Sequence, residues 1–190
     1  AHHQATRFVV PVRRELGVRT IFNFLGPLTN PAGAERQLIG VSDAGFLETM
    51  AGAMARLGTR HALLVSSEDG LDELSISAPT RVIEVQGQEI SSFRVTAEEL
   101  GLKPAAPEAI PGGDPAANAD TTRRILSGEP GPARELALLN AGAAIYAGGG
   151  AESLADGVRV GAQVIDSGAA AATLERFVAA TRELAPKAIS

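Results

Sequence analysis

One strand–helix–strand run constrains the fold of this chain more than any other part of it. Residues 61–67 (His-Ala-Leu-Leu-Val-Ser-Ser) form a short continuous apolar segment, the pattern of a strand that is buried on both faces in a parallel sheet. A strand is also predicted at 36–41, followed by a helix that is capped by Ser42-Asp43 and stops at Gly58. Strand, helix and strand form a βαβ unit, whose crossover is nearly always right-handed. The sequence therefore predicts an α/β fold with a mostly parallel sheet flanked by helices.

The remainder of the chain is predicted to add a hairpin and a series of helices. Residues 80–85 and 89–95 are β-rich segments on either side of a turn at Gly87, and a shorter β segment is expected at 75–77. Helices are expected at 3–16, 118–126, 132–147, 153–167 and 169–184, with a second helix or a turn at 18–25. We expect the helix after Asp43 to bury five apolar side chains: Phe46, Leu47, Met50, Met54 and Leu57.

Composition excludes several classes of protein. The chain has 190 residues, enough for one domain with a full core, and its net charge of −5 argues against a nucleic acid-binding protein with a basic face. No apolar run approaches the roughly 20 residues that a membrane span requires, and the first residues show no secretory signal. The absence of cysteine rules out disulfides and thiolate metal sites and fits a cytosolic setting. We therefore expect a single α/β domain over 1–190, with no membrane or nucleic acid partner.

Two adjacent carboxylates, Asp72 and Glu73, follow the apolar strand at 61–67. Ligands of open α/β sheets gather at the carboxyl ends of the strands, which is where this loop begins. Adjacent carboxylates repel each other, and Mg²⁺ relieves that repulsion while using only one or two carboxylates together with substrate phosphates. A solvated acidic pair without a ligand is the alternative, and it is common in loops.

The stretch 22–31 (Phe-Asn-Phe-Leu-Gly-Pro-Leu-Thr-Asn-Pro) contains two X-Pro steps. Because proline restricts the residue before it, we expect Gly26 and Asn30 to be extended or turned, exposing backbone groups that suit a planar ligand. A plain helix-to-strand connector is the alternative. The arginine pair Arg13-Arg14 lies upstream, where a solvated helix face is the alternative to a site for an anion.

The other candidate motifs give little indication of a catalytic or ligand-binding role. His61 has no His, Asp or Cys at ligand spacing, so a packing or surface role is expected. Gly112-Gly113-Asp114 is flanked by prolines and is predicted to be a turn rather than a phosphate-binding loop. The glycines at 148–150 are predicted to cap the preceding helix. No serine lies in a nucleophile-elbow pattern.

Several stretches resemble the anthranilate phosphoribosyltransferase family, in the order in which the family carries them and over nearly the whole chain. They are His3 and residues 12–23, 25–31, 68–73, 112–114, 118–119, 138–141 and 165–169. The resemblance implies an enzyme of tryptophan biosynthesis that transfers the phosphoribosyl group of phosphoribosyl pyrophosphate (PRPP) to anthranilate and releases pyrophosphate.

The resemblance also implies roles for particular residues. Arg13 matches the arginine near the anthranilate carboxylate, for which a planar guanidinium is well suited. His3, Gly26 and Pro27 match positions that line the path of anthranilate. The pair Asp72-Glu73 matches the acidic pair that binds Mg²⁺ with the pyrophosphate. The chain departs from the family at Thr6, where relatives often carry a larger side chain, so a wall contact is expected to be lost there.

The family's N-terminal helical domain, its phosphoribosyl-binding glycine loop and its lysine-bearing loop have no counterpart in these residues. The resemblance therefore implies a C-terminal portion that is inactive alone, taken from a cytoplasmic homodimer that associates through the absent helices. A non-catalytic, nucleic acid-binding relative on the same fold is the alternative, and a split or proteolytic product with only a structural identity is a third. The turn at 26–31, the pair Asp72-Glu73 and the acidic net charge favour the enzyme over the nucleic acid-binding relative.

Overall fold

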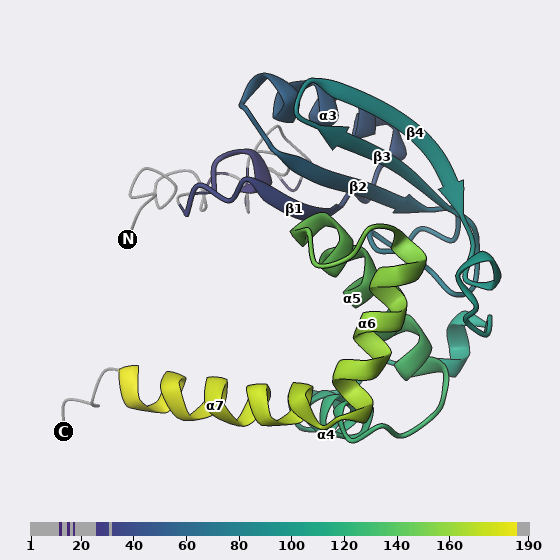
Figure 1. The fold of residues 1–190 in the computed structure, drawn as a ribbon, viewed down its shortest axis with the longest axis vertical. Coiled ribbons are helices and arrows are strands. Elements are labelled where there is room, and N and C mark those ends of the chain that lie inside the picture. Colours follow the sequence, from purple (N-terminus) through teal and green to yellow (C-terminus); the bar gives the residue numbers. More distant parts are fainter. Residues whose placement is uncertain (1–11, 13–14, 16, 18–25, 31, 186–190) are drawn as a thin grey trace.

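A four-stranded sheet lies between helices in the computed structural model of the chain, which describes residues 12, 15, 17, 26–30 and 32–185. Helix α3 covers one face of the sheet and α5 covers the other, α6 packs against α5, and α7 extends away from the body (Figure 1). The elements are β1 (Arg36–Gly40), η1 (Ala44–Phe46), α3 (Leu47–Arg56), β2 (His61–Ser67), β3 (Thr80–Gln86), β4 (Glu89–Val95), η2 (Glu98–Leu100), η3 (Pro107–Ala109), α4 (Pro115–Leu126), α5 (Pro132–Gly148), α6 (Leu154–Asp166) and α7 (Ala169–Leu184). The α/β class is confirmed.

The strands follow one another across the sheet in the order β1-β2-β3-β4. The pair β1–β2 is parallel, with Arg36 opposite His61, whereas β2–β3 and β3–β4 are antiparallel. The described sheet is therefore mixed rather than mostly parallel. A parallel pair needs a crossover such as α3. The loop between β2 and β3 contains no helix to form one, and the two residues between β3 and β4 permit only a hairpin.

Strand β2 supplies both hydrophobic cores, because all seven of its residues are buried. Leu63 and Val65 point into the core shared with α5 and α6, and Ala62 and Leu64 point into the core shared with α3. Each large apolar side chain that is fully buried contributes about 1.5–3 kcal/mol. The prediction of a strand buried on both faces is confirmed.

The helix after β1 begins with a 3-10 turn that shifts its apolar face. Asp43 caps this turn, because its side chain accepts a hydrogen bond from Gly45 N–H. Leu47, Met50 and Met54 are buried as predicted, but Phe46 is 40% exposed and Leu57 is 65% exposed. The two errors have different causes. Phe46 lies in the 3-10 turn, whose period differs from that of the α-helix, and Leu57 lies beyond the last turn of α3.

The β segment predicted at 75–77 is wrong, because this stretch is part of the loop between β2 and β3. Side-chain hydrogen bonds replace a strand ladder here: Ser75 N–H donates to Thr80 Oγ1 at 3.0 Å, and Ser77 N–H donates to Ser75 Oγ at 2.9 Å. Serine side chains compete in this way with regular pairing.

The C-terminal helices agree with the predicted ranges to within a few residues. Asp114 caps α4 by accepting from Ala117 N–H at 2.8 Å, so residues 112–114 form the predicted turn, with no strand directly before it. Gly149 ends α5 in the left-handed region, at φ +82°, as predicted for the glycine run. Of the helix predicted at 3–16, only residues 12 and 15 are described and both are helical, and 18–25 lies outside the described residues.

Helices α5 and α6 approach each other at a pair of glycines. A Cβ atom on Gly157 would lie 2.1 Å from the carbonyl oxygen of Gly142, and one on Gly142 would lie 2.5 Å from Val158 N. Real Cβ atoms do not make such contacts, so the crossing of α5 and α6 requires glycine at both positions.

Among the described residues, no helix is both long and apolar enough to cross a membrane.

The substitution Gly157→Ala is expected to destabilise the chain by about 1–3 kcal/mol, because the added methyl group forces α5 and α6 apart. Urea unfolding followed by circular dichroism measures the effect. Gly148→Ala is the matched control, since a Cβ there meets nothing within 4 Å, and we expect no loss of stability. Equal midpoints for Gly157→Ala and the parent would contradict the close approach.

Candidate functional site

The loop of residues 68–79, between β2 and β3, begins where the parallel strands β1 and β2 end, and it carries the two predicted metal ligands. Asp72 and Glu73 are both exposed. Another carboxylate of the loop, Glu68, forms an ion pair with Arg94 of β4 at 2.7 Å. Asp72 and Glu73 make no ion pair among the described residues, so both side chains are open to a ligand from solvent.

The first half of this loop is held by a turn around Asp69. The carboxylate of Asp69 accepts hydrogen bonds from Leu71 N–H at 3.2 Å and from Ser75 Oγ at 2.5 Å, while Ser67 N–H donates to Leu71 O at 3.0 Å. Partial burial raises the pKa of Asp69, but the hydrogen bonds from Ser75, Ser67 and the Leu71 amide outweigh it, so the pKa lies below its ordinary value. Asp69 therefore stays ionised and serves the loop's geometry.

Gly40, the last residue of β1, permits the close approach of this loop. A Cβ atom at Gly40 would lie only 1.6 Å from the carbonyl oxygen of Asp72. The backbone that carries Asp72 thus rests directly against the end of β1. Sequence reasoning did not single out Gly40, although a glycine at the end of a strand pattern is a known sign of close backbone approach.

The loop is held at its other end by Asn140 of α5. The side-chain amide of Asn140 accepts from Leu74 N–H at 3.0 Å and donates to Leu74 O at 2.9 Å. Sequence reasoning also missed this contact, because the two residues are 66 positions apart in the chain.

The donor set fits Mg²⁺ better than a structural metal. Within the part of the chain that the structure describes, no group of three or more His, Cys, Asp or Glu side chains is placed to hold a metal ion. A structural zinc site takes four protein ligands. Mg²⁺ takes one or two carboxylates and completes its octahedron with water and phosphate oxygens, which is what Asp72 and Glu73 on an open loop can accommodate.

The turn that contains Gly26 and Pro27 differs from its prediction. Gly26 has helical backbone together with Pro27 and Leu28, and is neither extended nor turned. The restriction before proline acts partly through the Cβ atom of the preceding residue, which glycine lacks. Gly26 is an exposed residue, but its carbonyl accepts a hydrogen bond from Thr29 N–H at 3.4 Å, and Pro27 is half-buried.

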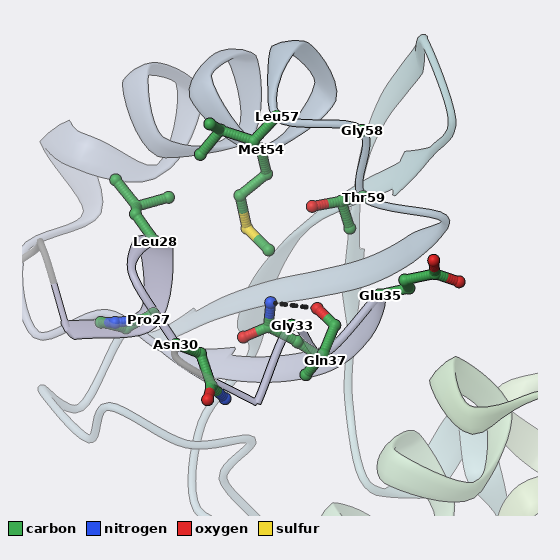
Figure 2. Close-up of a pocket in the computed structure, with 11 residues that line it drawn as sticks. Pro27, Leu28, Asn30, Gly33, Glu35, Gln37, Met54, Leu57, Gly58 and Thr59 are labelled. Atoms are coloured by element: carbon green, nitrogen blue, oxygen red, sulfur yellow. Dashed lines mark hydrogen bonds between the residues drawn. The ribbon is translucent and has the colours of Figure 1, made fainter. Parts of the chain in front are cut away.

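Pro27 lines an open pocket of about 310 Å³ (Figure 2). The turn supplies Pro27, Leu28 and Asn30, and the opposite wall comes from the end of α3 and the start of β1, including Met54, Leu57, Thr59, Glu35 and Gln37. The amide of Gln37 donates to the carbonyl of Ala34 at 3.0 Å inside this pocket.

The described residues do not join the turn and the acidic pair into one cavity. The pocket beside Pro27 lies at the start of β1, whereas Asp72 lies at the end of that strand, against Gly40. Arg13 and His3, the other predicted contacts of anthranilate, lie outside the described residues, as does Thr6. Of the predicted site residues, the structure therefore describes Asp72, Glu73, Gly26 and Pro27.

A second polar cluster occupies the opposite end of the sheet, where β2 begins. His61 Nε2 lies 2.8 Å from Glu84 Oε1, and the hydroxyl of Tyr146 donates to the same oxygen at 2.7 Å. The rings of His61 and Tyr146 meet edge to face with centroids 4.9 Å apart. His61 is buried, so the packing role expected for it is confirmed, while its half-buried partners Glu84 and Tyr146 were not foreseen.

The chain belongs to the family described as "Glycosyl transferase family, a/b domain", whose model matches residues 1–171. The sheet flanked by helices agrees with the a/b domain of that description.

The relatives found within it are anthranilate phosphoribosyltransferases. The enzyme of that name from Rubrobacter xylanophilus is 50% identical over 185 residues, which is 97% of this chain and 54% of that protein. The crystal structure of the Thermus thermophilus enzyme matches with a TM-score of 0.87 at 48% identity, covering 95% of this chain and 53% of that one. The Saccharomyces cerevisiae enzyme in complex with PRPP and Mg matches with a TM-score of 0.87 at 26% identity, covering 96% and 53%. The chain thus spans about half the length of the relatives it matches.

The hydroxyl of Tyr146 is expected to lose its proton at a higher pH than an ordinary tyrosine. Burial, the hydrogen bond to Glu84 and the charge of that carboxylate raise the pKa of Tyr146 to about 12. Because the pKa is raised on folding from about 10, this hydroxyl stabilises the folded chain below pH ~10, and the contribution is lost as the pH rises towards 12. Tyr146 is the only tyrosine and the chain has no tryptophan, so tyrosinate absorbance after a pH jump reports this residue alone.

The substitution Glu84→Gln should lower that midpoint because it removes the adjacent charge, while burial of the ring keeps the pKa of Tyr146 above its ordinary value. Glu98→Gln, which alters a distant carboxylate of η2, is the control and should leave the midpoint unchanged. A parent midpoint near 10 would contradict the Tyr146–Glu84 contact.

Proposed function

We propose that this chain forms the C-terminal portion of an anthranilate phosphoribosyltransferase, which transfers the phosphoribosyl group of PRPP to anthranilate and releases pyrophosphate. The observation that carries the proposal is the exposed pair Asp72-Glu73, held at the carboxyl ends of β1 and β2 in a chain about half identical to enzymes of this name. The chain alone is proposed to be inactive, because its relatives are about twice as long.

Asp72 and Glu73 are proposed to bind Mg²⁺ together with the pyrophosphate of PRPP. The metal neutralises negative charge on the departing pyrophosphate. The protein's own contribution is to hold two carboxylates on a loop whose backbone is fixed by the Asp69 turn and by Asn140. A relative crystallised with PRPP and Mg supports this assignment.

Arg13, His3, Gly26 and Pro27 are proposed to line the anthranilate side of the site. The guanidinium of Arg13 would pair with the carboxylate of anthranilate, since a planar fork matches a carboxylate in two parallel hydrogen bonds. A relative crystallised with 4-fluoroanthranilate supports a site for an aminobenzoate in this family. Thr6 would leave that side of the path more open than the larger side chain that relatives often carry there.

The transfer depends on positioning of the substrates more than on covalent catalysis by the protein. Anthranilate must be held with its amine in line with the bond between C1′ and the pyrophosphate oxygen, and the leaving group must be stabilised as that bond breaks. The same resemblance supports a complete enzyme that is cytoplasmic and dimerises through helices outside this segment.

In a complete enzyme that carries this segment, Asp72→Asn combined with Glu73→Gln should lower kcat/KM at limiting Mg²⁺ by on the order of 100-fold, because metal stabilisation of charge contributes several kcal/mol. The rate is measured as PRPP-dependent consumption of anthranilate across a Mg²⁺ titration. Glu68→Gln is the control, since that carboxylate is ion-paired with Arg94, and it should leave the titration unchanged. An unaltered Mg²⁺ titration for the double variant would refute the metal assignment.

Arg13→Ala in the same enzyme should lower kcat/KM for anthranilate by about 10–100-fold, the equivalent of a charged hydrogen bond of about 1.5–3 kcal/mol. The KM for PRPP should remain within about threefold of the parent, because the arginine is assigned to the other substrate. Arg14→Ala removes the neighbouring guanidinium and serves as the control. Steady-state constants for anthranilate equal to those of the parent would exclude the proposed role of Arg13.

A further inference from the structure

Asn140 of α5 forms two side-chain hydrogen bonds with the acidic loop, which is the loop of residues 68–79 that carries Asp72 and Glu73. Asn140 lies in the third turn of α5, directly after Leu138 and Leu139, which are both buried in the core beneath β2. The helix is therefore anchored where it presents this amide. The amide Nδ2 also donates to Leu136 O at 3.1 Å within α5, which fixes the orientation of the side chain.

The contact with Leu74 uses both ends of the amide. Oδ1 accepts from Leu74 N–H at 3.0 Å, and Nδ2 donates to Leu74 O at 2.9 Å, so the side chain pairs with the main chain as a neighbouring strand residue would. The side chain of Leu74 is completely buried. No other hydrogen bond to the main chain of Leu74 is found among the residues that the structure describes.

The contact between Asn140 and Leu74 matters because Leu74 directly follows the acidic pair Asp72-Glu73. Leu71 is fixed by Ser67 and Asp69 on one side of the acidic pair, and Leu74 is fixed by Asn140 on the other. Only Asp72 and Glu73 lie between these two fixed residues, and the backbone of Asp72 packs directly against Gly40. Releasing Leu74 would therefore free the backbone of the two carboxylates without removing either of them.

We propose that Asn140 is a positioning residue, which acts through the Leu74 main chain to hold Asp72 and Glu73 in the geometry that binds a divalent cation with pyrophosphate. The proposal rests on the metal role proposed above for the acidic pair. Residues that orient metal ligands without touching the metal are typically worth 10–100-fold in metal affinity. Asn140 itself touches neither substrate nor metal.

The test replaces Asn140 by an isosteric side chain that cannot donate. In a complete enzyme that carries this segment, Asn140→Asp keeps an acceptor for Leu74 N–H but presents an oxygen to Leu74 O. We expect the affinity for Mn²⁺ in the presence of pyrophosphate, measured from the free Mn²⁺ signal in electron paramagnetic resonance, to fall by about 10–100-fold. The KM for anthranilate should stay within about twofold of the parent, because the acidic pair is assigned to the other substrate.

The chain offers a matched control in Asn118. Its amide makes the same double contact with a main chain, accepting from Gly113 N–H and donating to Gly113 O, both at 2.9 Å, but at the start of α4. Asn118→Asp should leave Mn²⁺ affinity unchanged. A general effect of losing an amide–main chain pair would reduce Mn²⁺ affinity in both variants, and that result would overturn the proposal.

A second variant keeps the proposal testable if Asn140→Asp fails to fold. Gly40→Ala displaces the same loop from its other side, because the added methyl group would overlap the Asp72 carbonyl, and it leaves the Asn140–Leu74 pair intact. It should weaken Mn²⁺–pyrophosphate binding without changing the KM for anthranilate. Unchanged Mn²⁺ affinity in a folded Asn140→Asp variant, or in Gly40→Ala when only that variant folds, would overturn the proposal.

The double variant at Asp72 and Glu73 separates this proposal from the one on which it rests. If that variant loses Mn²⁺ affinity and Asn140→Asp does not, the metal site stands and Asn140 has a purely structural role. If the double variant itself binds Mn²⁺ as the parent does, the metal assignment fails first, and the positioning role fails with it.

Discussion

The structure depends on the complete burial of β2. Because both faces of this strand are covered, one short segment supplies Leu63 and Val65 to one core and Ala62 and Leu64 to the other. The crossover helix α3 and the later helix α5 are thereby fixed on opposite faces of the same strand (Figure 1). The carboxyl end of β2 is consequently a fixed point, and the acidic loop begins there.

The loop that follows is positioned by a turn of its own and by contacts from two other elements, β1 and α5. Its first turn is closed by the carboxylate of Asp69, its middle rests on the end of β1 at Gly40, and its far end is paired with α5 through Asn140. None of these contacts uses Asp72 or Glu73 side-chain oxygens. The arrangement separates support of the backbone from the groups assigned to the metal, which is what a preorganised site for a charged ligand requires.

The sequence predicted most of the fold but only part of the site. Strand β2, the hairpin at Gly87 and the four C-terminal helices were predictable because periodicity and capping residues act locally. The contacts of Gly40 with Asp72 and of Asn140 with Leu74 could not be predicted, since they join residues far apart in the chain. The error at Ser75 has the opposite origin: a β-like pattern was overridden by local hydroxyl groups that bond within the loop.

Helix α5 connects the two ends of the sheet through side chains that are less than two turns apart. Asn140 reaches the loop at the carboxyl end of β2, and Tyr146 reaches Glu84 and His61 near the amino end of the same strand. A displacement of α5 along its axis would therefore disturb both clusters together. Since Tyr146 is the chain's only tyrosine and tryptophan is absent, its ultraviolet spectrum is a built-in optical reporter of how the helix behind the acidic loop is seated.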